Sequence, residues 1–219
     1  MYLRVAGGEF RGRKLRTVPG VGTRPLLGKV REAVFNILGP EIQGAQVWDL
    51  FAGTGASGIE ALSRGAARVI FVEKANSALR VLRANLDELG LDLVAPGEKQ
   101  RAIVLRGNAW EPQIIDPVTG EPFEGEPEPE MPPSFVFFDP PYAAVREDPT
   151  STVDRLGKLL DRLAPAGRLV FHFPEGVLDE DDLAHLGVVD MRVWGSSAVA
   201  FIEGVGAEQS DDARLPEAE

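Results

Sequence analysis

Short apolar runs alternate along this chain with segments in which apolar residues recur every three or four positions. The apolar runs predict buried strands at residues 47–51, 68–73, 102–105, 135–138 and 167–173. The segments with the longer period predict helices at residues 29–38, 57–64, 76–89 and 153–163. Two further β-prone runs, residues 186–193 and 198–203, are interpreted as a closing antiparallel pair. Strands that alternate with helices are typical of an α/β fold with a mostly parallel sheet.

The amino-terminal end has a different pattern. Residues 2–5 and 14–18 are short β-prone runs around Gly7, Gly8 and Gly12, which predicts a hairpin. Apolar and basic side chains alternate along these runs, and successive side chains of a strand point to opposite faces. One face of the hairpin should therefore carry a row of arginines.

Charge is distributed unevenly along the chain, whose formal net charge is −11. Residues 1–31 hold eight basic residues and one acidic residue, which leaves 15 basic and 33 acidic residues for the remainder. This asymmetry indicates that the basic end binds a polyanion, with a merely solvated charged face as the alternative. The candidate residues for binding this polyanion are Arg4, Arg11, Arg13, Lys14, Arg16 and Arg24.

The length of 219 residues fits one main domain with small additions. We assign residues 1–28 to a basic hairpin extension, residues 29–204 to the main domain, and residues 205–219 to a disordered acidic tail. Residues 112–133 are rich in proline and glycine and contain no basic residue, which predicts an acidic insertion loop.

The composition argues against several classes of protein. The sequence has no cysteine and only two histidines, so it offers no disulfide and little material for a metal site. No apolar run approaches 18 residues, and the first ten residues lack the apolar stretch of a signal peptide. We expect a cytoplasmic protein without a membrane span or a metal, and a monomer.

The most informative stretch surrounds the strand of residues 47–51. Asp49 is followed by Gly53, Gly55 and Gly58 in the pattern G-x-G-x-x-G, and a helix is predicted directly after it. A strand, a tight glycine turn and a helix amino terminus are the usual cradle for an adenosine-containing cofactor. Glu73, at the end of the next predicted strand, is placed to accept hydrogen bonds from ribose hydroxyls.

Two cofactors suit this pattern. A nicotinamide dinucleotide would bring its pyrophosphate to the glycine turn, where the carboxylate of Asp49 would repel it. S-adenosylmethionine would bring a sulfonium and an ammonium group, which a carboxylate attracts. Asp49 therefore favours S-adenosylmethionine, and an oxidoreductase remains the alternative.

A second motif, Asp139-Pro140-Pro141-Tyr142, follows the apolar strand of residues 135–138. It stands at the carboxyl end of that strand, where α/β sheets place their active sites. The two prolines hold the backbone rigid, so the Asp139 carboxylate and the Pro140 carbonyl become fixed acceptors for an exocyclic amine. The ring of Tyr142 can stack on a nucleobase.

Asp139-Pro140-Pro141-Tyr142 resembles the (D/N/S)-P-P-(Y/F/W) signature of methyltransferases that act on exocyclic amines. More specifically, the chain resembles the bacterial 16S ribosomal RNA guanine-N2 methyltransferases of the RsmD type. Besides the Asp139 motif, residues 4–15, 23–25, 30–36 and 49–66 carry this resemblance, and the amino-terminal block is its most family-specific part.

The resemblance implies a Rossmann-like, S-adenosylmethionine-dependent methyltransferase fold, whose seven-stranded, mostly parallel sheet has an antiparallel last strand. It implies methyl transfer to the N2 amine of a guanine, with small-subunit ribosomal RNA or an assembling 30S particle as the partner. It implies a target-base site at Asp139, Pro140, Pro141 and Tyr142. The cofactor site that it implies consists of Asp49, Phe51, Ala52, Gly53, Thr54, Gly55, Gly58, Glu73, Lys74, Asn108 and Ala109.

Several alternatives remain open at the level of sequence. A DNA adenine-N6 methyltransferase would use the same Asp139 chemistry, and a non-catalytic RNA-binding ribosome-assembly factor would need only the basic hairpin. Arg24 and Arg31 could contact either a cofactor carboxylate or an RNA phosphate, and Asn36 could reach cofactor or substrate. His172, near a strand end, is interpreted as a structural histidine rather than a member of the site.

Overall fold

The computed structural model describes residues 2–18, 25–91, 100–112 and 132–204. Arg24, most of the predicted acidic insertion and the predicted acidic tail lie outside the described residues.

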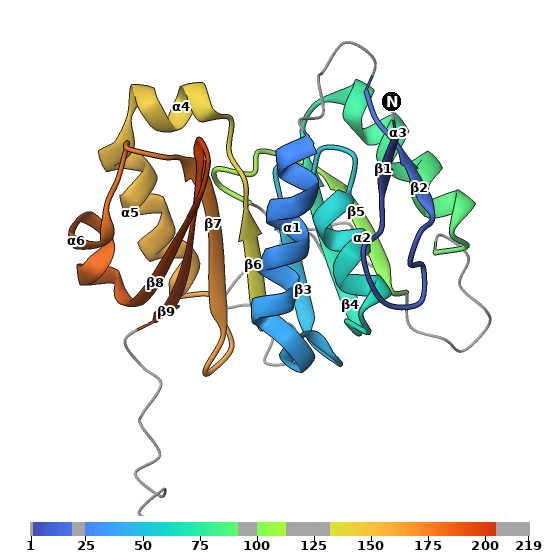
Figure 1. Cartoon of the computed structure of the whole chain (residues 1–219), viewed down its shortest axis with the longest axis horizontal. Helices are drawn as coiled ribbons and strands as arrows, with labels where there is room; N and C mark the ends of the chain where they lie inside the picture. Colours follow the sequence, from blue (N-terminus) through green and yellow to red (C-terminus); the bar gives the residue numbers. More distant parts are fainter. Residues whose placement is uncertain (1, 19–24, 92–99, 113–131, 205–219) are drawn as a thin grey trace, which may run out of the picture.

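Seven strands form one sheet in the order β5-β4-β3-β6-β7-β9-β8. Their bounds are β3 Gln46–Leu50, β4 Arg68–Glu73, β5 Ala102–Arg106, β6 Phe135–Phe138, β7 Arg168–Pro174, β8 Gly187–Trp194 and β9 Ser197–Gly204. The pairs among β3 to β7 are parallel, whereas β9 runs antiparallel to both β7 and β8. This confirms the predicted seven-stranded, mostly parallel sheet with an antiparallel last strand (Figure 1).

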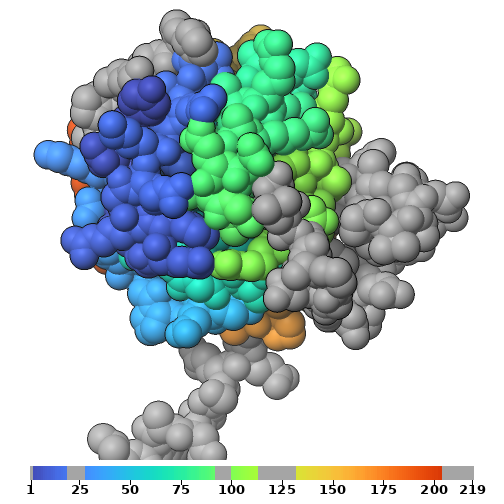
Figure 2. Space-filling model, turned by 90° about the vertical axis from the view of Figure 1, so that its right-hand side faces the viewer, coloured from blue at the N-terminus to red at the C-terminus, as the bar shows by residue number. Residues whose placement is uncertain are grey.

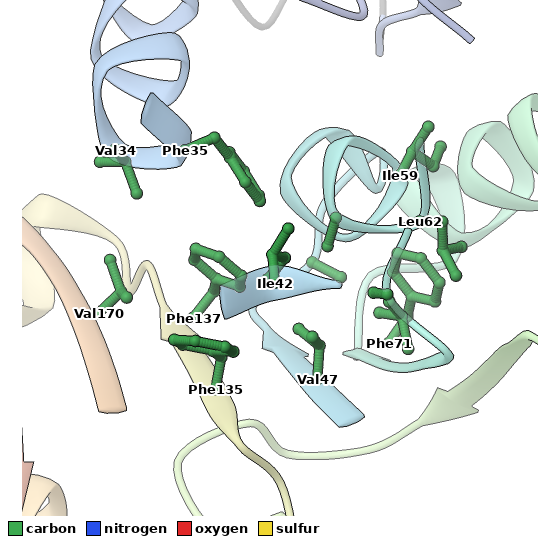
Figure 3. Packing of buried hydrophobic residues seen from close by; sticks show 14 of the residues in the cluster. Val34, Phe35, Ile42, Val47, Ile59, Leu62, Phe71, Phe135, Phe137 and Val170 are labelled. Atoms are coloured by element: carbon green, nitrogen blue, oxygen red, sulfur yellow. The ribbon is translucent and has the colours of Figure 1, made fainter. Parts of the chain in front are cut away.

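Helices cover both faces of the sheet. One face packs against α1 (Pro25–Leu38), α2 (Ala56–Ser63) and α3 (Asn76–Glu88), and the other against α4 (Tyr142–Glu147), α5 (Pro149–Leu160) and α6 (Glu180–Leu183). Two short 3-10 helices, η1 (Gly39–Ile42) and η2 (Ala184–Leu186), follow α1 and α6. Figure 3 shows the first face, where Phe35 of α1 lies above Phe137 of β6 with ring centroids 5.1 Å apart.

Three helices differ from the sequence-based expectation. The helix α1 begins at Pro25 rather than residue 29, since proline fits the first position of a helix. Likewise, α5 begins at Pro149 rather than residue 153, and the Asp148 side chain caps it by accepting from the Ser151 N–H over 2.9 Å. The residues after Pro141 form the short helix α4, where the sequence predicted only a loop.

The basic extension forms the predicted hairpin of β1 (Tyr2–Arg4) and β2 (Lys14–Arg16). Glu60 of α2 is fully buried and accepts the backbone N–H groups of Ala6 and Gly7 over 2.8 and 2.9 Å. A Cβ on Gly8, which has φ of +74°, would lie 1.7 Å from the Ser63 carbonyl oxygen. This close approach to α2 requires glycine, and it holds the hairpin firmly against the domain.

The other side of the hairpin lies along α3, as Figure 2 shows. The buried carboxamide of Asn85 accepts the Arg16 N–H over 2.8 Å and donates to the Arg16 carbonyl over 3.2 Å. The same amide nitrogen donates to the Thr54 carbonyl over 2.9 Å. One side chain therefore ties β2 to the glycine turn.

Candidate active site

The glycine turn lies between β3 and α2. Gly53 and Gly55 adopt left-handed φ angles of +56° and +82°. A Cβ on Gly58 would lie 2.2 Å from Cε1 of Phe71 in β4, so only glycine lets α2 pack this closely on the sheet. The expected strand–turn–helix unit is therefore present, with β3 ending at Leu50 and Phe51 already in the left-handed region at φ of +59°.

Asp49 points from β3 into the protein beneath this turn. Its side chain is buried, and its Oδ2 accepts the Gly58 N–H over 2.8 Å. Burial raises the pKa of Asp49 to about 8, an effect that the Gly58 hydrogen bond opposes and the negative charges of Asp139 and Glu73 strengthen. A cation bound beside Asp49 would stabilise its carboxylate form.

Glu73, at the end of β4, closes the other side of the turn. Its Oε2 accepts the Gly53 N–H over 2.9 Å, and its Oε1 accepts the N–H groups of Lys74 and Ala75 over 2.8 and 2.7 Å. Two N–H groups of the glycine motif, those of Gly53 and Gly58, are thus already bonded to carboxylates. The turn therefore presents the carboxylate of Glu73 and an Asp49 acid that a bound cation can ionise, rather than the free N–H groups that bind a pyrophosphate.

The two sequence motifs meet because β3 and β6 are neighbouring parallel strands, with Leu50 paired to Phe138. The Asp139 N–H lies 3.5 Å from the Leu50 carbonyl oxygen, which continues the ladder by one residue. Parallel strands end at the same edge of a sheet, so the glycine turn and the Asp139 motif adjoin each other.

The Asp139 side chain is about half exposed and belongs to a chain of hydrogen bonds. Its Oδ1 lies 2.8 Å from Nδ1 of His172, and Nε2 of that ring lies 2.8 Å from the Tyr142 hydroxyl. The hydroxyl is also 2.7 Å from Oγ of Ser197, a buried residue of β9. Strands β7 and β9 therefore hold both ends of the Asp139 motif.

A cavity of about 130 Å³ opens beside Asp139, between α1 and the sheet. Its walls are mostly apolar, and Asp139, His172 and Arg31 supply its charged or titratable groups. Ala56 and Ser57, at the start of α2, line the side nearest the glycine turn. One cavity is therefore lined by Asp139 and by the two residues that follow Gly55 in the glycine motif.

Arg31 of α1 brings a positive charge to this cavity. Its side chain is about nine-tenths buried, and its Nε lies 3.7 Å from the Glu60 carboxylate without a hydrogen-bond partner. Nη2 donates to the Arg4 carbonyl over 2.6 Å. Burial lowers the pKa of Arg31, while Glu60 opposes that effect.

Aromatic rings support the loops around the turn. The Phe51 ring meets those of Trp110 and Phe138 edge-on, at centroid distances of 5.0 and 5.4 Å. The exposed Asn108 and the buried Ala109 follow β5, and Oδ1 of Asn108 lies 3.3 Å from the Trp110 N–H. This places Asn108 and Ala109 at the same edge of the sheet as Glu73, because β4 and β5 are paired and parallel.

Three of the predicted RNA-binding cations make contacts within the protein. Nη1 of Arg4 donates to the Gly12 carbonyl over 2.8 Å, and Nη2 of Arg13 donates to the Glu88 carbonyl over 2.6 Å. Arg16 forms an ion pair with the Glu88 carboxylate. The contacts of Arg13 and Arg16 fix the hairpin to α3, whereas that of Arg4 lies within the hairpin, and all three side chains stay exposed.

Arg11 and Lys14 are also exposed on the hairpin. Lys14 lies over the Tyr2 ring, with its ammonium 5.5 Å from the ring centroid. The predicted alternation of apolar and basic residues is confirmed, since Leu15 is buried between the exposed Lys14 and Arg16.

The structure adds His172 and Ser197 to the surroundings of the Asp139 motif and places Asn36 outside the lining of the cavity. His172 reads as structural in the sequence, yet it lies between Asp139 and Tyr142, and its place near the end of a strand beside β6 was the available signal. Ser197 carries no recognisable motif. Asn36, by contrast, is exposed, accepts from Nη1 of Arg64 over 3.2 Å, and is not among the residues that line the cavity.

Two expected absences concern metals and membranes. Within the described ranges, no group of three or more histidine or acidic residues could hold a metal ion. None of the described helices is long and apolar enough to cross a membrane.

The sequence matches a known family over most of its length. The family described as Conserved hypothetical protein 95 matches residues 3–203. Ribosomal RNA small subunit methyltransferase D of Escherichia coli K12 is 46% identical over 87 residues, which cover 40% of this chain and 44% of that protein. The chain thus spans less than half the length of the curated relatives that it matches.

Solved structures share the fold. The Escherichia coli protein yhhF has a TM-score of 0.66 and 28% identity, with 92% of this chain and 97% of that one covered. The 16S rRNA N2 G1207 methyltransferase RsmC of Thermus thermophilus, solved with AdoMet and guanosine, has a TM-score of 0.62 and 18% identity. That likeness covers 93% of this chain and 50% of RsmC, and at this identity it concerns the fold alone.

Proposed function

Because the chain belongs to the family described as Conserved hypothetical protein 95, we propose that it transfers a methyl group from S-adenosylmethionine to the N2 amine of a guanine in small-subunit ribosomal RNA. One observation carries the proposal: the glycine turn and the Asp139 motif follow neighbouring parallel strands, and the cavity beside Asp139 extends to Ala56 and Ser57 of the glycine motif. A methyl donor and a clamped amine must meet within bonding reach, and this arrangement allows it.

The relatives point to the same reaction. The Escherichia coli relative is named a small-subunit ribosomal RNA methyltransferase, and the Thermus thermophilus RsmC structure contains a methyl donor together with guanosine. We extend this substrate class to the present chain.

The bonding of the glycine turn supports S-adenosylmethionine over a dinucleotide. The Gly53 and Gly58 N–H groups are occupied by the carboxylates of Glu73 and Asp49. A pyrophosphate would find these N–H groups occupied and would be repelled by Glu73. The sulfonium and ammonium groups of S-adenosylmethionine would be attracted by Glu73 and by the ionised form of Asp49.

We assign the residues that would hold the cofactor from the family resemblance. Asp49, Phe51, Ala52, Gly53, Thr54, Gly55 and Gly58 would surround the methionine part, while Glu73 and Lys74 would take the ribose and one side of the adenine. Asn108 and Ala109, on the neighbouring loop, would take the adenine edge. When bound, S-adenosylmethionine supplies an electrophilic methyl group on a positively charged sulfur.

Arg31 is assigned to the cofactor carboxylate rather than to RNA phosphate. It lies about nine-tenths buried in the cavity that Asp139 and Ser57 also line. A small anionic group inside the cavity can reach it, whereas the phosphates of a folded RNA stay outside.

The target amine would bind at the Asp139 motif. Guanine N2 is a weak nucleophile because its lone pair is delocalised into the ring. Hydrogen bonds from the amine to the Asp139 carboxylate and the Pro140 carbonyl would orient that lone pair, and the Tyr142 ring would stack on the base. Fixed positioning of this kind can lower a bimolecular barrier by about 7–11 kcal/mol.

The base must leave its stack to enter the pocket, which favours a loop nucleotide. The basic hairpin of residues 1–28 would bind phosphates and set the position of the RNA, while residues 29–204 perform the transfer. The acidic insertion and the tail are assigned no role in the chemistry.

The test starts with ligand binding and ends with the product. Calorimetry with S-adenosylhomocysteine should show binding, and NAD should show none. Incubation with unmodified 16S rRNA and labelled S-adenosylmethionine, followed by nucleoside analysis, should yield N2-methylguanosine. N6-methyladenine in DNA would indicate the DNA methyltransferase, and RNA binding without transfer would indicate an assembly factor.

A further inference from the structure

His172 joins the two functional ends of the Asp139 motif. Its ring nitrogens lie 2.8 Å from Oδ1 of Asp139 and 2.8 Å from the Tyr142 hydroxyl. The ring is mostly buried on β7, while the carboxylate that it contacts is about half exposed. The rigid imidazole of His172 therefore holds the Asp139 carboxylate, which could otherwise rotate in solvent.

The donors and acceptors of this chain can be assigned from their chemistry. A carboxylate only accepts, so Nδ1 of His172 must carry the hydrogen that bonds Asp139. In the neutral ring Nε2 is then the acceptor, and the Tyr142 hydroxyl donates to it. The phenol oxygen is left to accept from the Ser197 hydroxyl, 2.7 Å away. Every bond in this arrangement has one donor and one acceptor.

The Tyr142 ring is held as well as its hydroxyl. The His172 ring meets it edge-on, with centroids 5.5 Å apart, and the Arg146 guanidinium lies 5.9 Å from its centroid. Both the plane of the stacking ring and the direction of the carboxylate thus depend on one histidine.

We propose that His172 is a positioning residue for methyl transfer, and that its two nitrogens serve two separable tasks. The Nδ1 side keeps the Asp139 carboxylate turned so that Oδ2 faces the amine, which supports kcat. The Nε2 side keeps the Tyr142 ring in place for the base, which supports KM for RNA. This inference deepens the proposed function and rests on it.

Two substitutions separate the tasks, because each keeps one nitrogen position of the imidazole. In His172→Asn the amide nitrogen can replace Nδ1, so we expect kcat to stay within a few-fold and KM for RNA to rise about tenfold. In His172→Gln the amide group can reach the place of Nε2, so we expect KM for RNA to stay unchanged. The Asp139 carboxylate loses its partner, so we expect kcat to fall about a hundredfold, the effect of a misplacement of about 1 Å. Affinity for S-adenosylhomocysteine should stay within a few-fold in both.

Tyr142→Phe supplies a matched control that leaves His172 intact. It should raise KM at least as much as His172→Asn does, because it removes the bonds of the hydroxyl to both His172 and Ser197. The double variant should be no worse than Tyr142→Phe alone, because that variant already lacks the His172 bond. Equal loss of kcat in the Asn and Gln variants, or wild-type kinetics in both, would overturn the proposal. If the His172 variants do not fold, an unchanged KM in Tyr142→Phe would overturn the part played by Nε2.

A spectroscopic measurement separates this inference from the proposed reaction. The chain has only two histidines, so ¹⁵N spectra of their rings can be assigned by comparison with a His185→Asn variant. In its neutral form, the His172 ring should carry its proton on Nδ1. Finding the proton on Nε2 would refute the hydrogen-bond assignment even if the protein methylates RNA. A correct tautomer in a protein that binds S-adenosylhomocysteine but transfers no methyl group would instead refute the proposed function.

Discussion

The backbone N–H of Gly58 donates to Oδ2 of Asp49 over 2.8 Å, which links the last glycine of the turn to the buried acid of β3. This hydrogen bond alone does not offset the cost of burying the carboxylate, because the pKa of Asp49 is still raised to about 8. The free protein therefore holds a largely neutral acid at the place where we propose that a cation binds.

Cofactor binding should consequently depend on pH. A bound sulfonium and ammonium favour the ionised Asp49, so binding must release the proton that Asp49 carries below about pH 8. Affinity for S-adenosylmethionine should rise about tenfold between pH 7 and pH 9. Calorimetry across this range measures the change.

The variant Asp49→Asn keeps an oxygen acceptor for Gly58 and cannot ionise, so its affinity for S-adenosylmethionine should be lower and independent of pH over the same range.

The stability of the free protein gives a second check on the pKa of Asp49. Between the unfolded pKa of about 4 and the folded pKa of about 8, the unfolded state holds fewer protons, so stability falls as pH rises. Relative to the wild type, Asp49→Asn should gain stability from pH 5 to pH 8. If the free energy of unfolding changed with pH in the same way in both proteins, the raised pKa of Asp49 would be contradicted.

Removal of the Asp139 carboxylate should stop methyl transfer and leave the affinity for the cofactor nearly unchanged. We expect Asp139→Ala to lose methyl transfer by at least about a hundredfold, the usual range for a group that positions or deprotonates a reactant. Affinity for S-adenosylhomocysteine should stay within a few-fold, because Asp139 lies on the amine side of the cavity. Single-turnover assays measure the first effect and calorimetry the second. Wild-type rates in this variant would remove Asp139 from the role assigned to it.

The hairpin should contribute to RNA binding through its cations. Arg11 and Lys14 are exposed, and neither forms one of the hairpin contacts to α3. Arg11→Ala combined with Lys14→Ala should weaken RNA binding and lower the slope of log affinity against log salt by about 2, roughly one for each lost phosphate contact. Filter binding at several salt concentrations gives the slope. Replacement of the exposed Lys158 on α5 serves as the control and should leave the slope unchanged.

Glu60 should determine whether the hairpin stays docked. It accepts two N–H groups from the hairpin, pairs with Arg64 over 2.8 Å and faces the buried Arg31. Glu60→Ala would leave these donors without a partner, so we expect a loss of about 3–5 kcal/mol in the free energy of unfolding. Urea denaturation measures this loss.

The milder change Glu60→Gln keeps an acceptor but not the charge, so it should lie between the wild type and Glu60→Ala. Release of residues 2–18 by limited proteolysis should follow the same order. Equal stability of all three proteins would show that the hairpin is held elsewhere.

Much of the fold could be predicted because its local patterns are strong. The strand at residues 68–73 and the strand at residues 135–138 match β4 and β6 residue for residue, since continuous apolar runs are typical of strands that are buried on both faces of a parallel sheet. The helix α4 was harder to predict. Two prolines directly before Tyr142 indicate a loop, whereas the following residues form a helix that buries Val145 in the core of that face.

The sequence alone determined the two motifs and their order, because glycine spacing, a strand-ending acid and paired prolines act through local backbone geometry. It also determined the basic hairpin, since alternation along a strand sets which side chains face outward. Only the tertiary structure decided that β6 adds beside β3 and that His172 from β7 reaches both Asp139 and Tyr142. Such contacts join residues about 30 to 90 positions apart, and strand order, which no local pattern encodes, brings them together.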